Sequence, residues 1–462
     1  VTQAIQVDEV DGEEGASLIS SSLLSPQLHR SDGSSTLSEV YNTIMAFQRH
    51  GMPLDDGLPW PFHLLHILFG YSLVIVPAAL FIRYVRGRSR GSAAIHEPTS
   101  LIGKAIRAFA IGRPEYSLLG GEEPEKRRED ADEVHLNRRR CFKDGLLLLA
   151  MFTGIQITLV AMGYLQEEVM TTGYQREGDS EQFDRFRDGQ FLIFCNRIVA
   201  LAVCVIVLGA SWTRQPPHVP PFYKHAFTSF SNTMSAWCQY EALKYVSFPT
   251  QTICKASKVA ATMVMGVIVR GQRYSLGESL CGAGITIGAS LFLLSAPAEE
   301  GKQKETATTI SGIILMLGYL AFDAFTLNWQ KALFDTRPKV SKYQMMLGVN
   351  LFSAVLCAVS LWEQGSLSDS ISFALSHNGF AKDAFLLSLS GAVGQLFIYT
   401  TIEKFGPIVF AVIMTIRQMI SIIVSTVSYG HAMTAVGFLG FCIVFGSIFG
   451  DIYRRYSQRS RK

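Results

Sequence analysis

Three cationic side chains lie deep inside apolar stretches of the sequence. Lys255 and Lys258 occur in QTICKASKVAATMVMGVIV, and Arg417 lies about ten residues from either end of VFAVIMTIRQMISIIVSTV. At the centre of a membrane-spanning helix each such charge costs roughly 2.5–3.5 kcal/mol, so an anion is needed to compensate it. Arginine binds phosphate through two parallel hydrogen bonds and lysine binds it as a point charge. The three cations therefore predict a buried site for a polyanionic ligand.

Few acids are available inside the apolar stretches to neutralise these cations. Asp323 and Glu241 are the candidates, so the sequence predicts a surplus of positive charge. Glu241 and Lys244 are three residues apart and predict a structural or gating salt bridge on one helix face. Arg197, in FLIFCNRIVAL, could contact the ligand or instead pair with a helix carbonyl or an acid. Lys255 lies near the end of its stretch, so snorkelling to the membrane surface is its alternative role.

Neutral polar side chains in other apolar stretches add candidates for contacts with a base or a ribose. The alternative for each is a hydrogen bond that joins two helices. The candidates are Tyr240, Asn328, Asn350, Gln395 and Tyr399.

The elements that position these residues are predicted membrane-spanning helices. The 462-residue chain is 48% hydrophobic and only 17% charged, whereas a soluble domain carries about 25% charged residues. Because a spanning helix needs roughly 20 mostly apolar residues, we predict an all-α polytopic membrane protein. The predicted spans are 62–85, 144–165, 190–211, 222–245, 250–270, 275–296, 308–330, 342–362, 383–403, 406–428 and 433–453. The 222–245 span is so polar that most of its surface must be hidden from lipid.

The distribution of Lys and Arg predicts the orientation of these spans. Of the 41 such residues, 26 lie in the segments on one side of the membrane and 8 in those on the other. Because cytosolic segments are enriched in Lys and Arg, the C-terminus is predicted to be cytosolic and the N-terminus lumenal. The chain then divides into a lumenal N-terminal segment (1–61), an extra transmembrane helix (62–85), a basic cytosolic linker (86–143), two five-helix regions and a cytosolic tail (456–462).

The two five-helix regions, 144–296 and 308–455, look like repeats of one another. FPTQTICKASKV (248–259) and FGPIVFAVIMTIRQM (405–419) each begin a span that contains a deep cation, and each is followed by a span with a G-x-x-x-G motif. Those motifs are Gly284/Gly288 and Gly446/Gly450. Since five is odd, the two halves insert in opposite orientations, as in secondary transporters that hold substrate between inverted repeats. We therefore predict a 5+5 inverted-repeat transporter.

Several classes of protein are disfavoured. There is no G-x-x-x-x-G-K-[ST] motif for nucleotide hydrolysis, no H-E-x-x-H motif and no C-x-x-C pair. We therefore predict no metal, no cofactor and no enzymatic activity, with a membrane-embedded transferase as the distant alternative. The net charge of +3 gives no reason to expect nucleic-acid binding.

Four segments carry a resemblance to a known family. WCQYEALKYVSFPTQTICKASKV (237–259), GYLAFDAFTLNWQKALF (318–334), QMMLGVNLFS (344–353) and GQLFIYTTIEKFGPIVFAVIMTIRQ (394–418) resemble the Golgi carriers of 3′-phosphoadenosine-5′-phosphosulfate (PAPS). These carriers form a branch of the nucleotide-sugar transporter family. The resemblance covers roughly 140–455 and includes the extra first span and the basic linker.

The resemblance implies ten spans in two inverted halves around a central nucleotide cavity. It also implies an antiporter in the Golgi membrane that supplies lumenal sulfation, importing PAPS in exchange for adenosine 3′,5′-bisphosphate or another nucleoside monophosphate. Lys255 or Lys258, together with Arg417, would contact phosphates. Arg417–Gln418 stands where carriers of nucleotide sugars often have a lysine motif, so a nucleotide-sugar transporter of the same fold is the alternative. The expected partners are the nucleotide, its counter-substrate, the lipid bilayer and a second copy of the chain.

Overall fold

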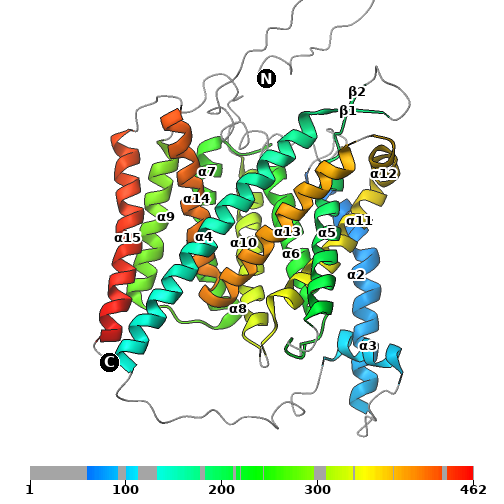
Figure 1. Ribbon diagram of the computed structural model, residues 1–462, viewed down its shortest axis with the longest axis horizontal. Helices are drawn as coiled ribbons and strands as arrows, with labels where there is room; N and C mark the ends of the chain where they lie inside the picture. Colours follow the sequence, from blue (N-terminus) through cyan, green and yellow to red (C-terminus); the bar gives the residue numbers. More distant parts are fainter. Residues whose placement is uncertain are drawn as a thin grey trace, which may run out of the picture.

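Long helices make up almost all of the chain that the structure describes (Figure 1). The computed structural model describes residues 60–91, 100–112, 133–176, 183–211, 215–218, 220–242, 244–295, 309–336, 339–377, 379–428 and 434–460. The helices are α2 (Trp60–Gly91), α3 (Leu101–Ala110), α4 (Glu133–Thr171), α5 (Gly189–Ala210), α6 (Lys224–Ala242), α7 (Phe248–Ala256), α8 (Lys258–Arg270), α9 (Leu276–Leu294), α10 (Ile310–Phe334), α11 (Lys342–Glu363), α12 (Ser366–Ser376), α13 (Phe380–Phe405), α14 (Pro407–Ser428) and α15 (Ala435–Ser460).

Each of the eleven predicted spans coincides with a helix or, for 250–270, with the pair α7 and α8. Within the described residues, seven helices are long and apolar enough to cross a membrane, and the bent pair α7–α8 raises that number to eight. Two further helices, α14 and α15, contain shorter apolar stretches. The prediction of an all-α polytopic membrane protein is therefore confirmed.

The polar helix α6 packs its Ser and Thr side chains against α10. Ser231 Oγ donates to the carbonyl of Phe322 at 2.6 Å, and Ser235 Oγ donates to the carbonyl of Tyr319 at 3.1 Å. Both serines are buried. Buried polar groups need hydrogen-bond partners of this kind. The polar face of α6 is therefore buried against α10 and not exposed to lipid, as the sequence predicts.

Four pairs of helices form the most extensive contacts: α9 with α15, α6 with α10, α4 with α13, and α5 with α11. In the first pair the backbones touch, since a Cβ atom on Gly440 would lie 2.6 Å from the carbonyl oxygen of Gly288. Gly446 and Gly450, the second G-x-x-x-G motif of the sequence, face open space instead. The face of α15 that contacts α9 runs through Gly440 and Ser447.

The two ends of the bundle differ in structure. At one end, the hairpin end, strands β1 (Gly173–Gln175) and β2 (Phe183–Arg185) pair antiparallel with Tyr174 opposite Asp184, and α12 lies beside them (Figure 1). At the opposite end, the tail end, lie α3 and the C-terminal end of the chain.

Some predicted connections contain more structure than expected. Helix α3 and the first eleven residues of α4 lie in the predicted linker 86–143, and α12 lies in the connection between two spans. Helix α15 continues to Ser460, into the predicted tail. Residues 1–59 of the predicted N-terminal segment lie outside the described residues.

Candidate functional site

The helix that carries both deep lysines is broken between them. The sequence predicts one span over 250–270, but α7 and α8 meet at Ser257 with a bend of 50°. The backbone N–H of Ser257 donates to the carbonyls of Ile253 and Cys254, and its hydroxyl also donates to Ile253, at 2.9 Å. A hydroxyl that competes for a helix carbonyl tightens and bends the turn. Lys255 and Lys258 are three residues apart, a spacing that predicts one shared face on a continuous helix. That prediction is wrong, because the two lysines lie on different helices on either side of the bend.

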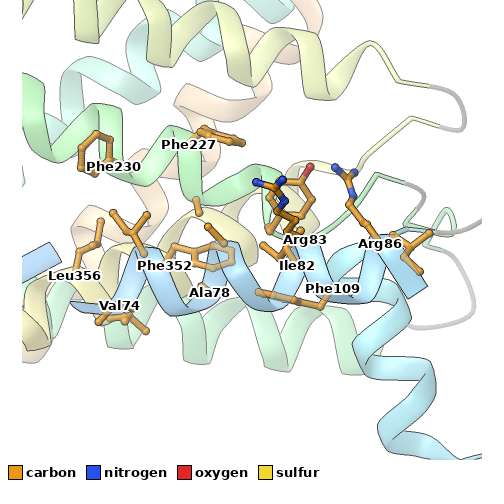
Figure 2. Close-up of a pocket in the computed structure, with 17 residues that line it drawn as sticks. Val74, Ala78, Ile82, Arg83, Arg86, Phe109, Phe227, Phe230, Phe352 and Leu356 are labelled. Carbon is orange, nitrogen blue, oxygen red and sulfur yellow. The ribbon is translucent and has the colours of Figure 1, made fainter. Parts of the chain in front are cut away.

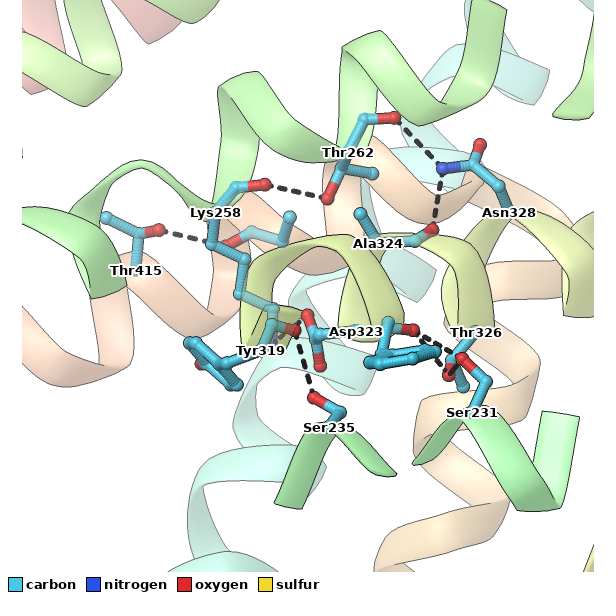
Figure 3. A network of polar contacts seen from close by, with 12 residues as sticks. Ser231, Ser235, Lys258, Thr262, Tyr319, Asp323, Ala324, Thr326, Asn328 and Thr415 are labelled. Atoms are coloured by element: carbon cyan, nitrogen blue, oxygen red, sulfur yellow. Dashed lines mark hydrogen bonds and ion pairs between the residues drawn. The ribbon is translucent and has the colours of Figure 1, made fainter. Parts of the chain in front are cut away.

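Lys258 forms an ion pair with Asp323 of α10, with 2.9 Å between Nζ and Oδ2 (Figure 3). The two side chains are only 15% and 20% exposed. Both acids expected inside the spans thus face a lysine, because Glu241 of α6 lies 3.3 Å from Lys244, two residues after the end of that helix. The Lys258–Asp323 pair links α8 to α10 at the start of α8.

Neighbouring helices hold the turn of α10 that carries Asp323. On one side, Asn328 Nδ2 donates to the carbonyls of Thr262 on α8 and Ala324 on α10, both at 2.9 Å (Figure 3). On the other side are the α6 serine contacts, extended by a 2.8 Å hydrogen bond from Thr326 to Ser231. Sequence reasoning did not single out these hydroxyl residues, although the run of Ser and Thr in α6 was a signal. Asn328 itself is fully buried and joins two helices.

Arg417 approaches the same place from α14, which packs against α8. Its charge acts on both Lys255 and Lys258, so the three predicted cations form one electrostatic group. Together with Asp323 they form the cation cluster, which carries three formal positive charges and one negative charge. Gln418, the next residue of α14, is half-buried. The structure thus brings together residues that lie about 160 positions apart in the sequence.

A second polar group connects α5, α11 and α13. Arg197 Nη1 donates to Asn350 Oδ1 at 3.3 Å, and Asn350 Nδ2 donates to Gln395 Oε1 at 2.7 Å. Tyr399, one turn beyond Gln395 on α13, is buried in the apolar core beside Phe334. Three of the predicted polar residues therefore form a chain of hydrogen bonds, with Arg197 at its end.

The remaining features lie elsewhere. Tyr240 of α6 is half-buried next to Glu241.

A cavity of about 1010 Å³ lies between α2, α3, α6 and α11, and its lining includes none of the predicted substrate residues. Among the residues that the structure describes, no group of three His, Cys, Asp or Glu side chains could hold a metal ion.

Comparison with known proteins adds one family match and three similar relatives. Residues 147–455 match the UAA transporter family. The chain is 59% identical over 418 residues to adenosine 3′-phospho 5′-phosphosulfate transporter 1 of Caenorhabditis elegans, covering 89% of this chain and 97% of that protein. It is 42% identical to the human protein of that name, covering 87% and 90%. It is 36% identical to UDP-galactose/UDP-glucose transporter 5 of Arabidopsis thaliana, covering 65% and 85%.

Proposed function

The chain belongs to the UAA transporter family, and we propose that it carries PAPS from the cytosol into the Golgi lumen in exchange for adenosine 3′,5′-bisphosphate or another nucleoside monophosphate. The observation that carries this proposal is the cation cluster at the break between α7 and α8. The names of the more similar relatives support PAPS, and the Arabidopsis relative makes a nucleotide-sugar carrier the alternative.

The charge of PAPS complements the cation cluster. PAPS carries two phosphates and a sulfate, roughly four negative charges near neutral pH. Lys255, Lys258 and Arg417 supply three positive charges, and the amino-terminal end of α8 adds the positive end of a helix dipole. Broken helices whose amino ends point at anionic substrate groups are typical of transporter sites. We therefore assign the phosphate contacts to these three side chains.

Asp323 gives the empty transporter an internal counter-ion. A substrate phosphate must compete with Asp323 for Lys258, because the two oppositely charged groups already lie 2.9 Å apart. When the nucleotide leaves, Asp323 again neutralises Lys258, and the cation cluster keeps more formal positive than negative charge. An anion travelling in the opposite direction offsets that excess, which favours exchange over an empty return.

The packing of the helices supports an inverted repeat of 144–296 and 308–455. The ten predicted spans after α2 are α4, α5, α6, α7–α8, α9, α10, α11, α13, α14 and α15. An inverted repeat makes each helix equivalent to the one five places away in this order, so that α6 corresponds to α13 and α10 to α4. The extensive α6–α10 contact then has its counterpart in the α13–α4 contact. The α5–α11 and α9–α15 contacts each join two equivalent helices. A pseudo-two-fold axis between two halves produces this pattern.

The orientation in this proposal follows the basic residues. Helix α3 and the C-terminal end of the chain lie together at the tail end (Figure 1), in line with the two basic segments predicted to be cytosolic. The hairpin end then faces the lumen together with residues 1–61.

The central experiment is an exchange assay with the purified chain in liposomes preloaded with adenosine 3′,5′-bisphosphate. We expect uptake of labelled PAPS, strong competition by unlabelled PAPS and weak competition by UDP-galactose. Stronger competition by UDP-galactose would favour the alternative of a nucleotide-sugar carrier. If no labelled nucleotide were transported, the alternative of a membrane-embedded transferase would be favoured. The mass of the purified particle tests for the expected homodimer.

Two variants test the site. Arg417→Ala and Lys258→Ala should abolish PAPS uptake, because each removes a charge that would bind phosphate. Lys339→Ala, which removes an exposed cation outside the spans, is the matched control. Full uptake by both cluster variants would exclude the assignment, provided that size-exclusion profiles show folded protein.

A further inference from the structure

The cavity beside α2 exists because that helix stands away from the bundle over its second half. Near its start α2 packs against α11: Ile67 and Tyr71 are buried in an apolar cluster with side chains of α6, α10 and α11, and His66 Nε2 lies 3.0 Å from Glu363 Oε1. From Val74 to Gly87 it lines a cavity of about 1010 Å³ instead. The opposite wall comes from aromatic and aliphatic side chains of α6 and α11, among them Phe227, Phe230, Phe352 and Leu356 (Figure 2).

One end of this cavity is basic. Figure 2 shows Arg83 and Arg86 together at the end remote from Val74 and Leu356. Arg86 is fixed there, since its Nε donates to the carbonyl of Ala110 at 3.1 Å and its guanidinium lies 5.1 Å from the centre of the Tyr223 ring. Arg83 is exposed and forms no hydrogen bond or ion pair with the part of the chain that the structure describes. Its guanidinium is therefore available to an anion.

The length of the cavity matches one leaflet of a bilayer. The stretch from Val74 to Gly87 extends about 20 Å along the helix axis, at a rise of 1.5 Å per residue. A leaflet is about half of the roughly 30 Å hydrocarbon core, with the headgroups beyond it. Helix α3 begins with Leu101 and Ile102, which are 85% and 74% exposed, as expected for a short amphipathic helix at the membrane surface. The arginine end therefore lies at headgroup depth.

We propose that this cavity binds an anionic glycerophospholipid, with an acyl chain along the apolar walls and the headgroup phosphate between Arg83 and Arg86. A nucleotide does not fit, because its base and ribose would lose hydrogen bonds to water against a wall of Phe, Val and Ile side chains. Basic pockets between transmembrane helices on the cytoplasmic side hold anionic headgroups. The basic end of this pocket lies on that side in the proposed orientation. The lipid would fill the gap between α2 and the bundle.

Native mass spectrometry of the full chain tests this proposal. The protein is purified from detergent and titrated with phosphatidylcholine or phosphatidylinositol, and the lipid that it retains is counted. We expect phosphatidylinositol to be retained in preference to phosphatidylcholine. Arg83→Gln should lower this retention about fivefold, the contribution of one basic side chain at an anionic surface. Inositol phosphate, the soluble headgroup, should not compete, because it lacks the acyl chain.

Further variants separate binding from misfolding. Arg83→Gln is the decisive change, because Arg86 also holds α3. Ala78→Trp fills the cavity and should remove bound lipid while both arginines remain. The double variant R273Q/K339Q removes two exposed cations elsewhere and should retain phosphatidylinositol like the unaltered chain. Equal retention of the two lipids, unchanged retention by Arg83→Gln, or no retained lipid at all would overturn the proposal. The last result is expected if protein, rather than lipid, covers the cavity.

Discussion

Binding of substrate at the proposed site depends above all on Lys258. Removing two charges from water costs several kcal/mol per ion, and their attraction repays this only in good geometry. The 2.9 Å contact with Asp323 provides that geometry in the empty protein. A substrate phosphate can pair with Lys258 only by displacing Asp323. Asp323 therefore competes with the substrate for Lys258.

Asp323→Asn should make the empty protein less stable and more responsive to substrate. Loss of the acid leaves Lys258 uncompensated inside the bundle, which should lower stability by about 3 kcal/mol. PAPS then supplies Lys258 with the anion that the variant has lost, so the increase in thermal unfolding temperature on adding PAPS should exceed that of the unaltered chain. Thermal unfolding with and without PAPS measures both effects.

Glu241→Gln is the matched control, because it breaks another lysine–acid pair, in which Glu241 lies 3.3 Å from Lys244, without touching the cation cluster. It should leave the response to PAPS unchanged. If Asp323→Asn responded to PAPS no more than Glu241→Gln does, Asp323 would have no role as the competing anion.

At the residue scale, the sequence predicted which side chains lie deep but not how they pair. Depth follows from the length of the apolar stretch, and Lys258 and Arg417 could be found from it. The partner of Lys258 depends on the bend at Ser257 and on the packing of α8 against α10. Those contacts join residues more than 60 positions apart, and the apolar pattern does not encode them.

At the scale of elements, the contact between α9 and α15 depends on two glycines. Gly288 and Gly440 allow the two backbones to approach so closely that a Cβ on either would lie within 3 Å of the other's carbonyl oxygen. Small residues allow such approach between membrane helices, which associate through van der Waals packing.

Gly440→Leu should separate α15 from α9. The added side chain has no room beside Gly288, so overpacking should lower stability by about 2 kcal/mol. Gly446→Leu on the same helix faces open space and should change stability by less than about 0.5 kcal/mol. Thermal unfolding of both variants in one detergent provides the comparison, and equal losses would place the contact elsewhere on α15.

The helices themselves could largely be predicted, whereas their interruptions could not. All eleven predicted spans coincide with helical regions, and for all but the polar span 222–245 length and hydrophobicity are enough to predict them. The family resemblance was likewise confirmed. The break at Ser257 and the short helices α3 and α12 depend on local hydrogen bonds and on contacts with neighbouring elements. Hydropathy does not report these.

At the scale of the whole molecule, the two ends of the bundle should face different compartments. An epitope tag after Lys462 should be recognised in sealed Golgi vesicles, because the tail end is proposed to face the cytosol. A tag between Gly178 and Asp179, in the connection between β1 and β2, should be recognised only after the vesicles are permeabilised. Recognition of the second tag in sealed vesicles would reverse the orientation.

The hairpin end also ties distant parts of the chain together. Tyr174 of β1 donates to Asp383 of α13 at 3.1 Å, and burial together with this carboxylate raises the pKa of the tyrosine. His377, after α12, lies 3.3 Å from Asp184 of β2, and Ser370 of α12 donates to Asp188 at 2.7 Å. These contacts connect the segment between α4 and α5 to α12, to the residue that follows it and to the start of α13.

Such contacts occur at both ends of the bundle. Spreading the helices at the hairpin end would break the three contacts just described, whereas spreading them at the tail end would break the ion pair between Arg270 and Asp335 and the hydrogen bond from Lys331 to the carbonyl of Glu403. Each end is thus closed by contacts of its own, and a carrier that opens to one compartment at a time would release one set while it keeps the other.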